Sequence, residues 1–401
     1  MSAPLWSGRV GVPTDRAVWE FLKGDDAELL PYDIQGTLLH AERLHAAGLL
    51  DDGQLAEVRA TLATLSRVEG DHEDVHSFIE ERLGDVGRYI HAGRSRNDQV
   101  ATAFRLYVVD ACAEAERALG GFVRVILARA ETEAETPMPG YTHLQRAIGV
   151  TVGHHLLAWV EMLERDRERL RFAAGQASAS PLGAGALAGS TLPLPPPPNA
   201  MRNSLDAVAD RDFALDYLYA AAVLFTHLSR IGEELVLWVT SEFGFARLPE
   251  NAATGSSMMP HKLNPDVAEL ARGKAGTAIG RLTGLLATVK GLPLAYDLDL
   301  QEDKPPVFAA RKDVAGALAA LAVLVGGLAF DRDRLAAACA DPLLRATDAA
   351  EQLVLEGVPF RDAHEQVAEQ VRTGTFAPPE HASPRLGDVA AAVAAAQARW
   401  A

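Results

Sequence analysis

The chain has 401 residues, 48% of them hydrophobic, and carries a formal net charge of −16. This acidity repels phosphate backbones, so we expect no nucleic-acid partner. The two cysteines, Cys112 and Cys339, form no motif, and residues 1–10 lack the apolar run of a secretory leader, so we expect a cytoplasmic protein. The uncharged run 314–330 is rich in glycine and alanine. We interpret it as a core or interface helix and expect no membrane partner.

The spacing of apolar residues predicts an all-α protein built on long helices. We expect an N-terminal helical domain over residues 1–96, a central long-helix bundle over 97–338 and a small C-terminal helical domain over 339–401. Long helices are predicted over residues 97–135, 203–240, 266–290 and 307–330. At ~1.5 Å per residue, the longest reach on the order of 50 Å, more than one chain of this size can cover. We therefore expect several copies of the chain to bury these helices against one another.

The sequence HEDVH, from His72 to His76, matches the zinc-protease pattern H-E-x-x-H. On one helix, both imidazoles would share a face with Glu73 nearby. The surroundings are polar, however, and no third ligand follows at a recognisable spacing. We interpret this motif as the polar start of a helix and expect no metal site.

The stretch HAGRSRNDQV, which begins at His91, places two arginines beside Asn97 and Asp98. The simpler interpretation is a loop that ends in an Asn or Asp helix cap. Guanidinium groups also bind carboxylates through paired hydrogen bonds, and a positive cluster in an acidic chain favours an anionic ligand. We therefore predict that Arg94, Ser95 and Asn97 contact such a ligand.

Two segments before helices, residues 140–145 and 253–264, are predicted to be loops. The first contains Thr142 and His143 after a Pro-Gly turn. A histidine in a loop is most often an ordinary surface residue, and it acts in catalysis only when a partner orients it.

The second loop lies in TGSSMMPHKLNP, residues 254–265, and the simpler interpretation is a surface loop before a capped helix. Asn264 can cap a helix that starts at Pro265. The glycine and serines at the start of the loop would let it close over a ligand. Lys262 could then meet a carboxylate near the helix N-terminus, where backbone N–H groups also favour negative charge.

These residues suit β-elimination from a succinyl-type substrate. Removing a proton beside a carboxylate creates a doubly charged aci-carboxylate, which Lys262, backbone N–H groups and hydroxyls can stabilise. Ser256 is the expected base, and His143, oriented by Glu269, would supply the second proton relay. This chemistry requires neither a metal nor an organic cofactor.

The stretch TGSSMMPHKLNP resembles the signature loop of the fumarase/aspartase superfamily. From about residue 5 to about residue 371, narrower stretches resemble the argininosuccinate lyase family: HAGRSRNDQVATAFRLYV, PGYTHLQRA, PLGAGALAGSTLP, NSLDAVADRDF, SEFGFARLP, KGLPLAYDLDLQEDK and GVPFRDAHEQV. The resemblance implies a three-domain lyase whose long central helices form the core of a homotetramer, with active sites built from several chains. It also implies cleavage of argininosuccinate to arginine and fumarate in arginine biosynthesis.

The resemblance implies roles for individual residues. His143 and Ser256 match the family's catalytic histidine and serine, and Glu269 matches the partner of the histidine. Lys262 and Asn264 match the groups around the succinyl carboxylates. Further substrate contacts are implied for Asn97, Thr142, Tyr296, Gln301 and Lys304.

The segment EFLKGDDAELLPYDIQG, residues 20–36, departs from the family pattern because it is shorter and lacks the usual serine. The leaving amine therefore stays open. One alternative is a lyase of the same mechanism that acts on another N-succinyl compound in specialised metabolism. The other is an inactive structural homologue like the lens crystallins, although the intact Ser256, Lys262 and His143 argue against it.

Overall fold

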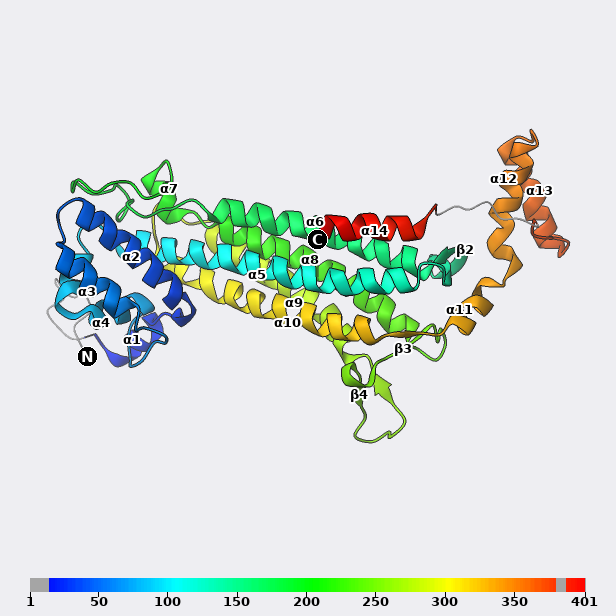
Figure 1. Cartoon of the computed structure of the whole chain (residues 1–401), viewed down its shortest axis with the longest axis horizontal. Coiled ribbons are helices and arrows are strands. Elements are labelled where there is room, and N and C mark those ends of the chain that lie inside the picture. The colour runs from blue at the N-terminus through cyan, green and yellow to red at the C-terminus, as the bar shows by residue number, and fades with distance from the viewer. Residues whose placement is uncertain (1–13, 380–386, 401) are drawn as a thin grey trace. The chain divides into compact units, whose positions relative to one another are not determined.

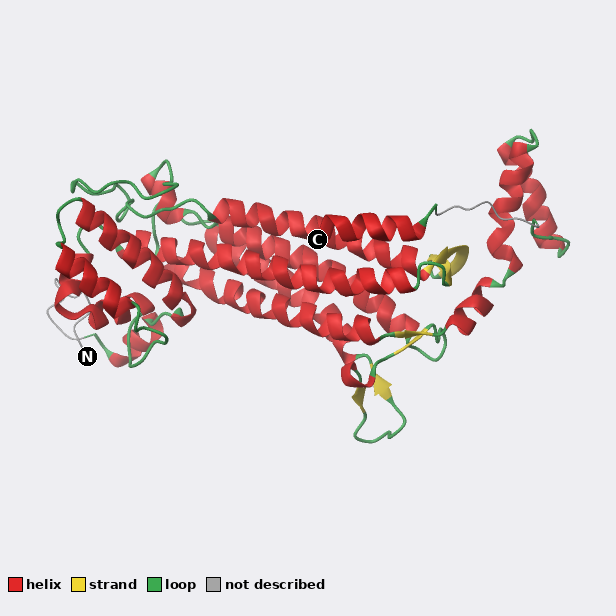
Figure 2. Ribbon diagram, viewed as in Figure 1, coloured by secondary structure: helices red, strands yellow, loops and turns green. Residues whose placement is uncertain are grey.

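A computed structural model describes residues 14–379 and 387–400, and nearly all of its regular structure is helical (Figure 2). The helices are α1 (Arg16–Leu22), α2 (Leu30–Ala46), α3 (Asp52–Leu62), α4 (Val75–Ile90), α5 (Arg96–Thr132), α6 (Val152–Ala177), α7 (Ser204–Ala209), α8 (Asp212–Trp238), α9 (Asp266–Val289), α10 (Lys304–Gly327), α11 (Arg332–Cys339), α12 (Ala346–Leu355), α13 (Phe360–Thr373) and α14 (Val389–Trp400). The predicted all-α class is confirmed. In the part of the chain that is described, no helix has both the length and the apolar character that crossing a bilayer needs.

Short antiparallel strand pairs interrupt the helices. They are β1 (Pro137–Thr142) with β2 (Gln145–Thr151), β3 (Ala246–Arg247) with β6 (Ala329–Phe330), and β4 (Thr254–Gly255) with β5 (Leu263–Asn264). The segments predicted as loops, residues 140–145 and 253–264, are the ends of β-hairpins: residues 143–144 and 256–262 form the connecting turn and loop, as predicted, whereas the flanking strand residues were missed. Their Gly, Pro and Ser content is typical of a loop, but the flanking residues pair across the turn.

The predicted long helices occur with shifted ends. α5 and α9 lie close to the predicted spans, whereas the helix expected over residues 203–240 is divided into α7 and α8. Asp210 interrupts it with an extended backbone (φ −59°, ψ 132°). Its carboxylate accepts hydrogen bonds from Arg105 on α5 and from the N–H of Asp212, which fixes the break. The helix expected to end at Phe330 ends at Gly327, because the next residues pair with β3.

The described residues divide into two compact units. Unit 1 holds the described residues up to Glu116, then Asp166–Leu224 and Gly276–Ala315; unit 2 holds Arg117–Arg165, Phe225–Ala275 and the described residues from Gly316 onwards. Helices α5, α6, α8, α9 and α10 contribute residues to both units. Because this division follows the long helices and not the sequence order, the three predicted domains stay a prediction.

Aromatic side chains fill the core of unit 1. Phe104 on α5 packs edge-on against Phe213 on α8, with ring centroids 5.3 Å apart. Tyr107, one turn further along α5, lies 4.7 Å from the ring of Phe308 on α10. Each fully buried side chain of this size contributes about 1.5–3 kcal/mol relative to exposure, so these contacts hold the three helices together.

Unit 2 has an aromatic core of its own. Trp159 on α6 stacks on Trp238 on α8 with centroids 5.3 Å apart, and Phe330 lies 6.0 Å from Trp238. Glu234 accepts hydrogen bonds from Trp159 Nε1 at 2.6 Å and from His155 Nε2 at 2.9 Å. The indole N–H of Trp159 and the imidazole of His155 therefore share one acceptor, as buried polar groups require.

A buried histidine of unit 1 is held in its neutral form. His40 on α2 meets the carbonyl of Ala92 through Nε2 at 3.0 Å and the guanidinium of Arg43 through Nδ1 at 3.2 Å. The carbonyl needs a donor and the guanidinium an acceptor, so the proton lies on Nε2. Burial and the positive charges of Arg94 and Arg43 lower the pKa of His40 to about 3.

We predict that mild acid destabilises the fold through His40. The unfolded histidine titrates near pH 6.5 and the folded one at about 3. The stabilisation is therefore complete above pH 6.5 and falls by about 1.4 kcal/mol for each pH unit below it. Between pH 6.5 and 5, His40 should lower the free energy of unfolding by about 2 kcal/mol, measured by urea denaturation. In the non-titrating control His40→Gln this part of the loss disappears, and an equal loss in both proteins would contradict the prediction.

Candidate active site

The β1–β2 hairpin of unit 2 carries His143 at its tip. Thr142 pairs with Gln145, so His143 and Leu144 form a two-residue turn. Both have positive φ, 54° and 55°, as a type I′ turn requires, although glycine or asparagine usually takes these positions. Left-handed backbone at other residues costs on the order of 1–3 kcal/mol each and clusters at functional sites. Both side chains are exposed, so the imidazole is open to a ligand.

Aromatic contacts hold this hairpin in unit 2. The ring of Tyr141, two residues before His143, lies 5.7 Å from that of Phe243 and 6.5 Å from that of Phe245. A cavity of about 700 Å³ adjoins the hairpin, and its wall includes Leu144 and these three rings but not His143. The ring contacts of Tyr141 thus anchor the strand that leads into the turn at His143.

The β4–β5 hairpin presents Ser256 at the start of its loop, and Figure 1 shows it projecting from the helices of unit 2. The Oγ of Ser256 accepts hydrogen bonds from the backbone N–H groups of Met258 and Met259, at 3.3 and 3.0 Å. Hydrogen bonds donated to an oxygen favour its anionic form. This arrangement therefore favours loss of the serine proton.

The other predicted residues of this region lie on the same hairpin or just after it. Asn264 donates from Nδ2 to the carbonyl of Gly255 at 3.4 Å and so links the two strands. The side chain of Lys262 is exposed at the end of the loop. Glu269 lies in the first turns of α9, also exposed. The hairpin thus carries a serine, an amide and a cation within nine residues of one another in the sequence.

The two hairpins occupy different places in unit 2. Figure 1 shows β1–β2 at the end of α5 and α6, and β4–β5 where α9 begins. Within the described residues, no hydrogen bond or ion pair joins His143 to Glu269 or Ser256. The orientation of His143 by Glu269 therefore stays a prediction.

Asp98 organises the predicted ligand contacts of unit 1. Its Oδ1 accepts a hydrogen bond from the N–H of Ser95 at 2.9 Å, and its Oδ2 accepts from Gly183 and Gly185 at 2.9 and 3.0 Å. Burial raises the pKa of Asp98, and these N–H groups oppose the rise. The carboxylate thereby joins the start of α5 to the loop that contains Gly183 and Gly185, a link that the sequence analysis did not include.

Asn97 and Arg94, which flank this link in the sequence, differ in exposure and in hydrogen-bond partners. Asn97 is partly exposed and donates from Nδ2 to the carbonyl of Ala186 at 3.2 Å. Arg94 is buried, donates to the Oγ1 of Thr37 at 2.9 Å, and balances the charge of Asp33. The guanidinium of Arg94 is thus engaged inside the protein, and its contact with a ligand stays a prediction.

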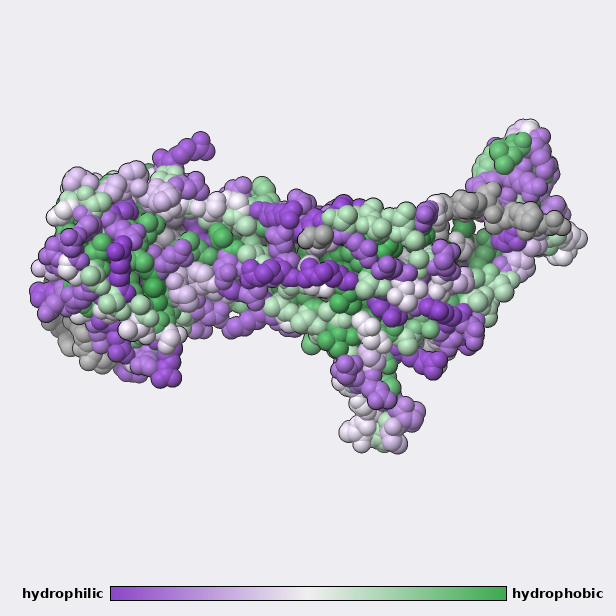
Figure 3. All heavy atoms as spheres, in the orientation of Figure 1, coloured by the Kyte–Doolittle hydropathy of each residue, from purple (hydrophilic) through white to green (hydrophobic). Residues whose placement is uncertain are grey.

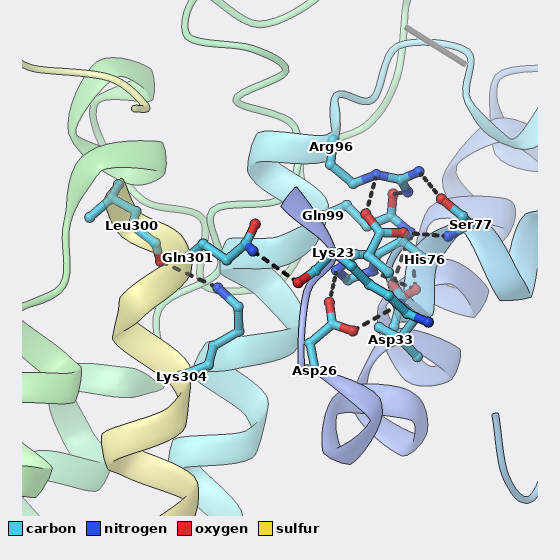
Figure 4. Close-up of polar contacts among 12 residues, drawn as sticks. Lys23, Asp26, Asp33, His76, Ser77, Arg96, Gln99, Leu300, Gln301 and Lys304 are labelled. Atoms are coloured by element: carbon cyan, nitrogen blue, oxygen red, sulfur yellow. Dashed lines mark hydrogen bonds and ion pairs between the residues drawn. The ribbon is translucent and has the colours of Figure 1, made fainter. Parts of the chain in front are cut away.

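Gln301 and Lys304 come together in unit 1, where the 3-10 helix η4 (Leu298–Asp303) leads into α10 (Figure 4). Gln301 donates from Nε2 to the carbonyls of Leu22 and Lys23, at 3.1 and 3.3 Å. Lys304 is buried and donates to Asp303 at 2.7 Å. Both side chains therefore have protein partners, and for Gln301 these lie in the segment that departs from the family pattern.

Tyr296 lies nearby, after a turn in which Ala295 has a φ of 72°. It is partly buried. Burial and the negative charge of Asp303 raise the pKa of Tyr296, so the phenol keeps its proton and can donate a hydrogen bond.

The HEDVH motif forms the polar start of a helix, as expected, with Asp74 as the N-cap of α4. α4 begins at Val75, so His72 precedes the helix, where its Nε2 meets the carbonyl of Glu69 at 2.8 Å. His76 is buried, with Nδ1 2.8 Å from Asp33 Oδ2 (Figure 4). Among the residues described, no group of three or more His, Cys, Asp or Glu is arranged to hold a metal ion.

His76 and Asp33 form a buried ion pair. Burial would lower the pKa of His76, but the carboxylates of Asp33 and Asp74 outweigh it and raise the pKa. Burial would likewise raise the pKa of Asp33, and His76 and Arg94 outweigh it, so that this pKa falls to about 2. The motif therefore places a charged histidine in the interior of unit 1.

Comparison with known proteins identifies the class first. The chain matches a family described as lyase over residues 52–280 and the argininosuccinate lyase C-terminal family over residues 343–378. The solved structure of EDDS lyase in complex with formate is 28% identical, with a TM-score of 0.75 over 86% of this chain and 72% of that one. A class II fumarase from Schistosoma mansoni, 14% identical, shares the fold with a TM-score of 0.70 over 87% of each chain. The fold is that of the fumarase/aspartase superfamily.

Closer relatives define the family. An argininosuccinate lyase of Frankia casuarinae is 50% identical over 389 residues, which cover 92% of this chain and 84% of that protein. One of Neisseria meningitidis is 45% identical over 394 residues, covering 93% of this chain and 86% of the relative. The chain belongs to the argininosuccinate lyase family.

We predict that Asp98→Asn destabilises the protein. An amide cannot accept from all three N–H groups at once, because its NH₂ end must face some of them. Each lost bond between a charged acceptor and a buried N–H group costs about 1.5–3 kcal/mol, so the free energy of unfolding should fall by about 2–4 kcal/mol in chemical denaturation. The control Asp85→Asn alters an exposed carboxylate and should stay within about 0.5 kcal/mol. Wild-type stability in Asp98→Asn would refute the role given to this carboxylate.

Proposed function

We propose that the protein is an argininosuccinate lyase, which reversibly eliminates L-arginine from argininosuccinate, leaves fumarate and serves arginine biosynthesis. The observation that carries the proposal is the 50% identity to the Frankia casuarinae lyase over 92% of this chain. We further propose that it works in the cytoplasm without metal, organic cofactor, nucleic acid or membrane. The net charge of −16 supports the absence of a nucleic-acid partner.

In the proposed reaction, Ser256, and not His143, removes the proton from the carbon beside a succinyl carboxylate. The backbone N–H groups of Met258 and Met259, which donate to Ser256 Oγ in the structure, would stabilise the serine alkoxide. Lys262, Asn264 and the N-terminus of α9 would stabilise the aci-carboxylate that forms. The carbon–nitrogen bond then breaks, its electron pair stays on nitrogen, and His143, oriented by Glu269, returns a proton to the leaving group.

The amino-acid end of the substrate belongs, in this proposal, with unit 1. The contacts would come from Arg94, Ser95, Asn97, Tyr296, Gln301 and Lys304, with Thr142 beside His143. Because the proposed residues lie on separate elements of one chain, we propose that several chains complete each active site. The chain would then fold as a three-domain lyase, with boundaries near residues 96 and 338, that assembles into a homotetramer.

The surface of α9 supports this assembly. A side chain added at Gly273, Gly276, Gly280 or Gly284 would meet no other atom within 4 Å, so the helix backbone is open to close approach along this row. On the same helix, Leu270 is 61% exposed and Ile279 is 50% exposed. Figure 3 shows hydrophobic atoms at the surface near the point where the β4–β5 hairpin leaves the long helices. Apolar side chains around small residues are typical of a face that packs against another helix.

We predict that the purified protein releases fumarate from argininosuccinate, followed by ultraviolet absorbance, without added metal. Ser256→Ala and His143→Asn should each lower kcat at least about 100-fold, the contribution of a general acid or base. The matched control His154→Asn changes an exposed histidine of α6 and should keep wild-type turnover. Near wild-type turnover in either active-site variant would refute its assignment.

The same assay separates the alternatives. Turnover of another N-succinyl amine at a kcat/KM higher than that of argininosuccinate would favour the specialised-metabolism lyase. A folded protein that turns over neither would favour the inactive structural homologue.

We predict a tetramer in solution, four times the chain mass of 42.8 kDa, by light scattering at micromolar concentration. Gly280→Glu places a charge in the open glycine row and should dissociate the assembly and abolish turnover, because a buried unpaired charge costs several kcal/mol. The control Leu355→Glu places the same charge at a residue of α12 that is 86% exposed and should leave the tetramer intact. A wild-type monomer would refute the assembly.

A further inference from the structure

The cavity of about 700 Å³ beside the β1–β2 hairpin has a wall built from several elements of unit 2. Residues of the hairpin, of the loop before β3, of α11 and of the 3-10 helix η5 (Pro342–Arg345) line it. α11 packs against β1, and η5 packs against β2, so these elements hold the wall together. The volume falls within the ~300–1,000 Å³ that is typical of small-molecule sites.

Part of the wall is apolar. The rings of Tyr141, Phe243 and Phe245 form a cluster in which the centroids lie between 5.5 and 6.5 Å apart. Leu144 and Leu343 also line the cavity, although they are 68% and 49% exposed. An apolar group in the cavity would remove these leucines from water, which is favourable.

Two arginines of the wall have no acidic partner. Arg146 on β2 donates to the carbonyl of Ala338 at 3.4 Å. Arg334, one turn before Ala338 on α11, donates from Nε and Nη2 to the carbonyls of residues 241–243, at 3.1–3.5 Å. Neither guanidinium forms an ion pair with a carboxylate of the described residues. Because a guanidinium has five N–H donors, both arginines keep donors for a carboxylate of a ligand.

The wall also carries two carboxylates. Glu242 is exposed, and its Oε2 accepts a hydrogen bond from Oγ of Ser241 at 3.0 Å. Asp341 is the N-cap of η5, where its Oδ1 accepts from the N–H of Leu343 at 3.0 Å. Across the part of the chain that is described, neither carboxylate pairs with a basic side chain. The second oxygen of each can therefore accept a hydrogen bond from a cationic group.

We propose that this cavity binds a free α-amino acid with a large apolar side chain. The carboxylate of the amino acid pairs with the guanidinium groups, its ammonium group pairs with the acidic side chains, and its side chain packs on the aromatic rings. A zwitterion satisfies both signs of charge in the wall, whereas a dicarboxylate or a phosphate would face the acidic side chains without a cation.

The proposed amino-acid site is separate from the proposed active site. None of the residues proposed for catalysis lines the cavity. Leu144, which does line it, shares the two-residue turn with His143. A bound amino acid would therefore contact the turn that carries the proposed catalytic histidine, without taking the place of the substrate.

Isothermal titration calorimetry of the whole protein with L-phenylalanine tests the site. We expect a dissociation constant of about 1 mM or tighter, in keeping with the small size of the ligand. Three comparison ligands each lack one group: 3-phenylpropionate the ammonium, phenethylamine the carboxylate and glycine the side chain. Each should bind at least about tenfold more weakly, because it leaves part of the wall unmatched. No binding of L-phenylalanine, or equal affinity for 3-phenylpropionate or phenethylamine, would overturn the inference.

Variants of the wall assign the binding to this cavity. Arg146→Ala should weaken binding of L-phenylalanine at least about tenfold, because a charge-assisted hydrogen bond is lost. The control Arg88→Ala removes an exposed arginine of α4 in unit 1 and should keep wild-type affinity. In the double variant Glu242→Gln/Asp341→Asn, L-phenylalanine should bind no more tightly than 3-phenylpropionate. Wild-type affinity in Arg146→Ala, or undiminished preference for L-phenylalanine in the double variant, would overturn the inference. The comparison ligands decide the question on the wild-type protein if a variant fails to fold.

Steady-state kinetics separates this site from the active site. Saturating L-phenylalanine should leave the KM for argininosuccinate within about twofold of its value without the amino acid, because the two ligands bind at different places. Competitive inhibition with a constant equal to the calorimetric dissociation constant would put L-phenylalanine in the active site and overturn the inference. Calorimetry does not require turnover, so a protein that binds L-phenylalanine but releases no fumarate would contradict only the proposed function.

Discussion

The need to surround two buried carboxylates with donors shapes unit 1. A buried anion without partners costs several kcal/mol, so the chain must bring hydrogen-bond donors to Asp33 and Asp98 from wherever they occur in the sequence. Asp33 receives the imidazole of His76 on α4 and the amide of Gln99 on α5. Asp98 receives N–H groups of the loop that contains Gly183. Each carboxylate thus fastens segments that are distant in sequence, and the proposed substrate contacts Arg94, Ser95 and Asn97 lie at the start of one of them, α5.

In unit 2, a different kind of interaction orders the proposed site residues. Its proposed catalytic residues His143, Ser256 and Lys262 lie on two hairpins, and their local order comes largely from short-range backbone geometry. The turn at His143 depends on two left-handed residues, and the loop at Ser256 depends on hydrogen bonds to residues two and three positions away. The β1–β2 hairpin is also held by the packing of Tyr141 against Phe243 and Phe245, whereas the loop of the β4–β5 hairpin is exposed. Chemistry that needs closure over a ligand is better placed on hairpins like these than on a buried carboxylate network.

Sequence reasoning predicted what local patterns determine. The long helices α5 and α9 follow from sustained apolar spacing, and Ser256 and Lys262 lie in one contiguous motif. The break at Asp210 could not be predicted, because Arg105 on another helix stabilises it. The β1–β2 hairpin was missed because its turn lacks the glycine or asparagine that signals a type I′ turn. Hydrogen-bond partners that are distant in sequence, such as the N–H groups of Gly183 and Gly185 that donate to Asp98, cannot be predicted from a local sequence pattern.

Residues 20–36 depart from the family pattern in length and side chains, whereas Gln301 contacts only the backbone of this segment. The missing serine would be a serious loss if the side chain of that segment made the contact. Here the acceptors are the backbone carbonyls of Leu22 and Lys23, which residues of any type supply. The shortened segment must preserve its backbone path. Two hydrogen bonds fix this path: the N–H of Gly24 donates to the carbonyl of Glu73, and the N–H of Val75 donates to the carboxylate of Asp26. A segment can therefore change length and side chains while still orienting the same glutamine, provided that these fixed points survive.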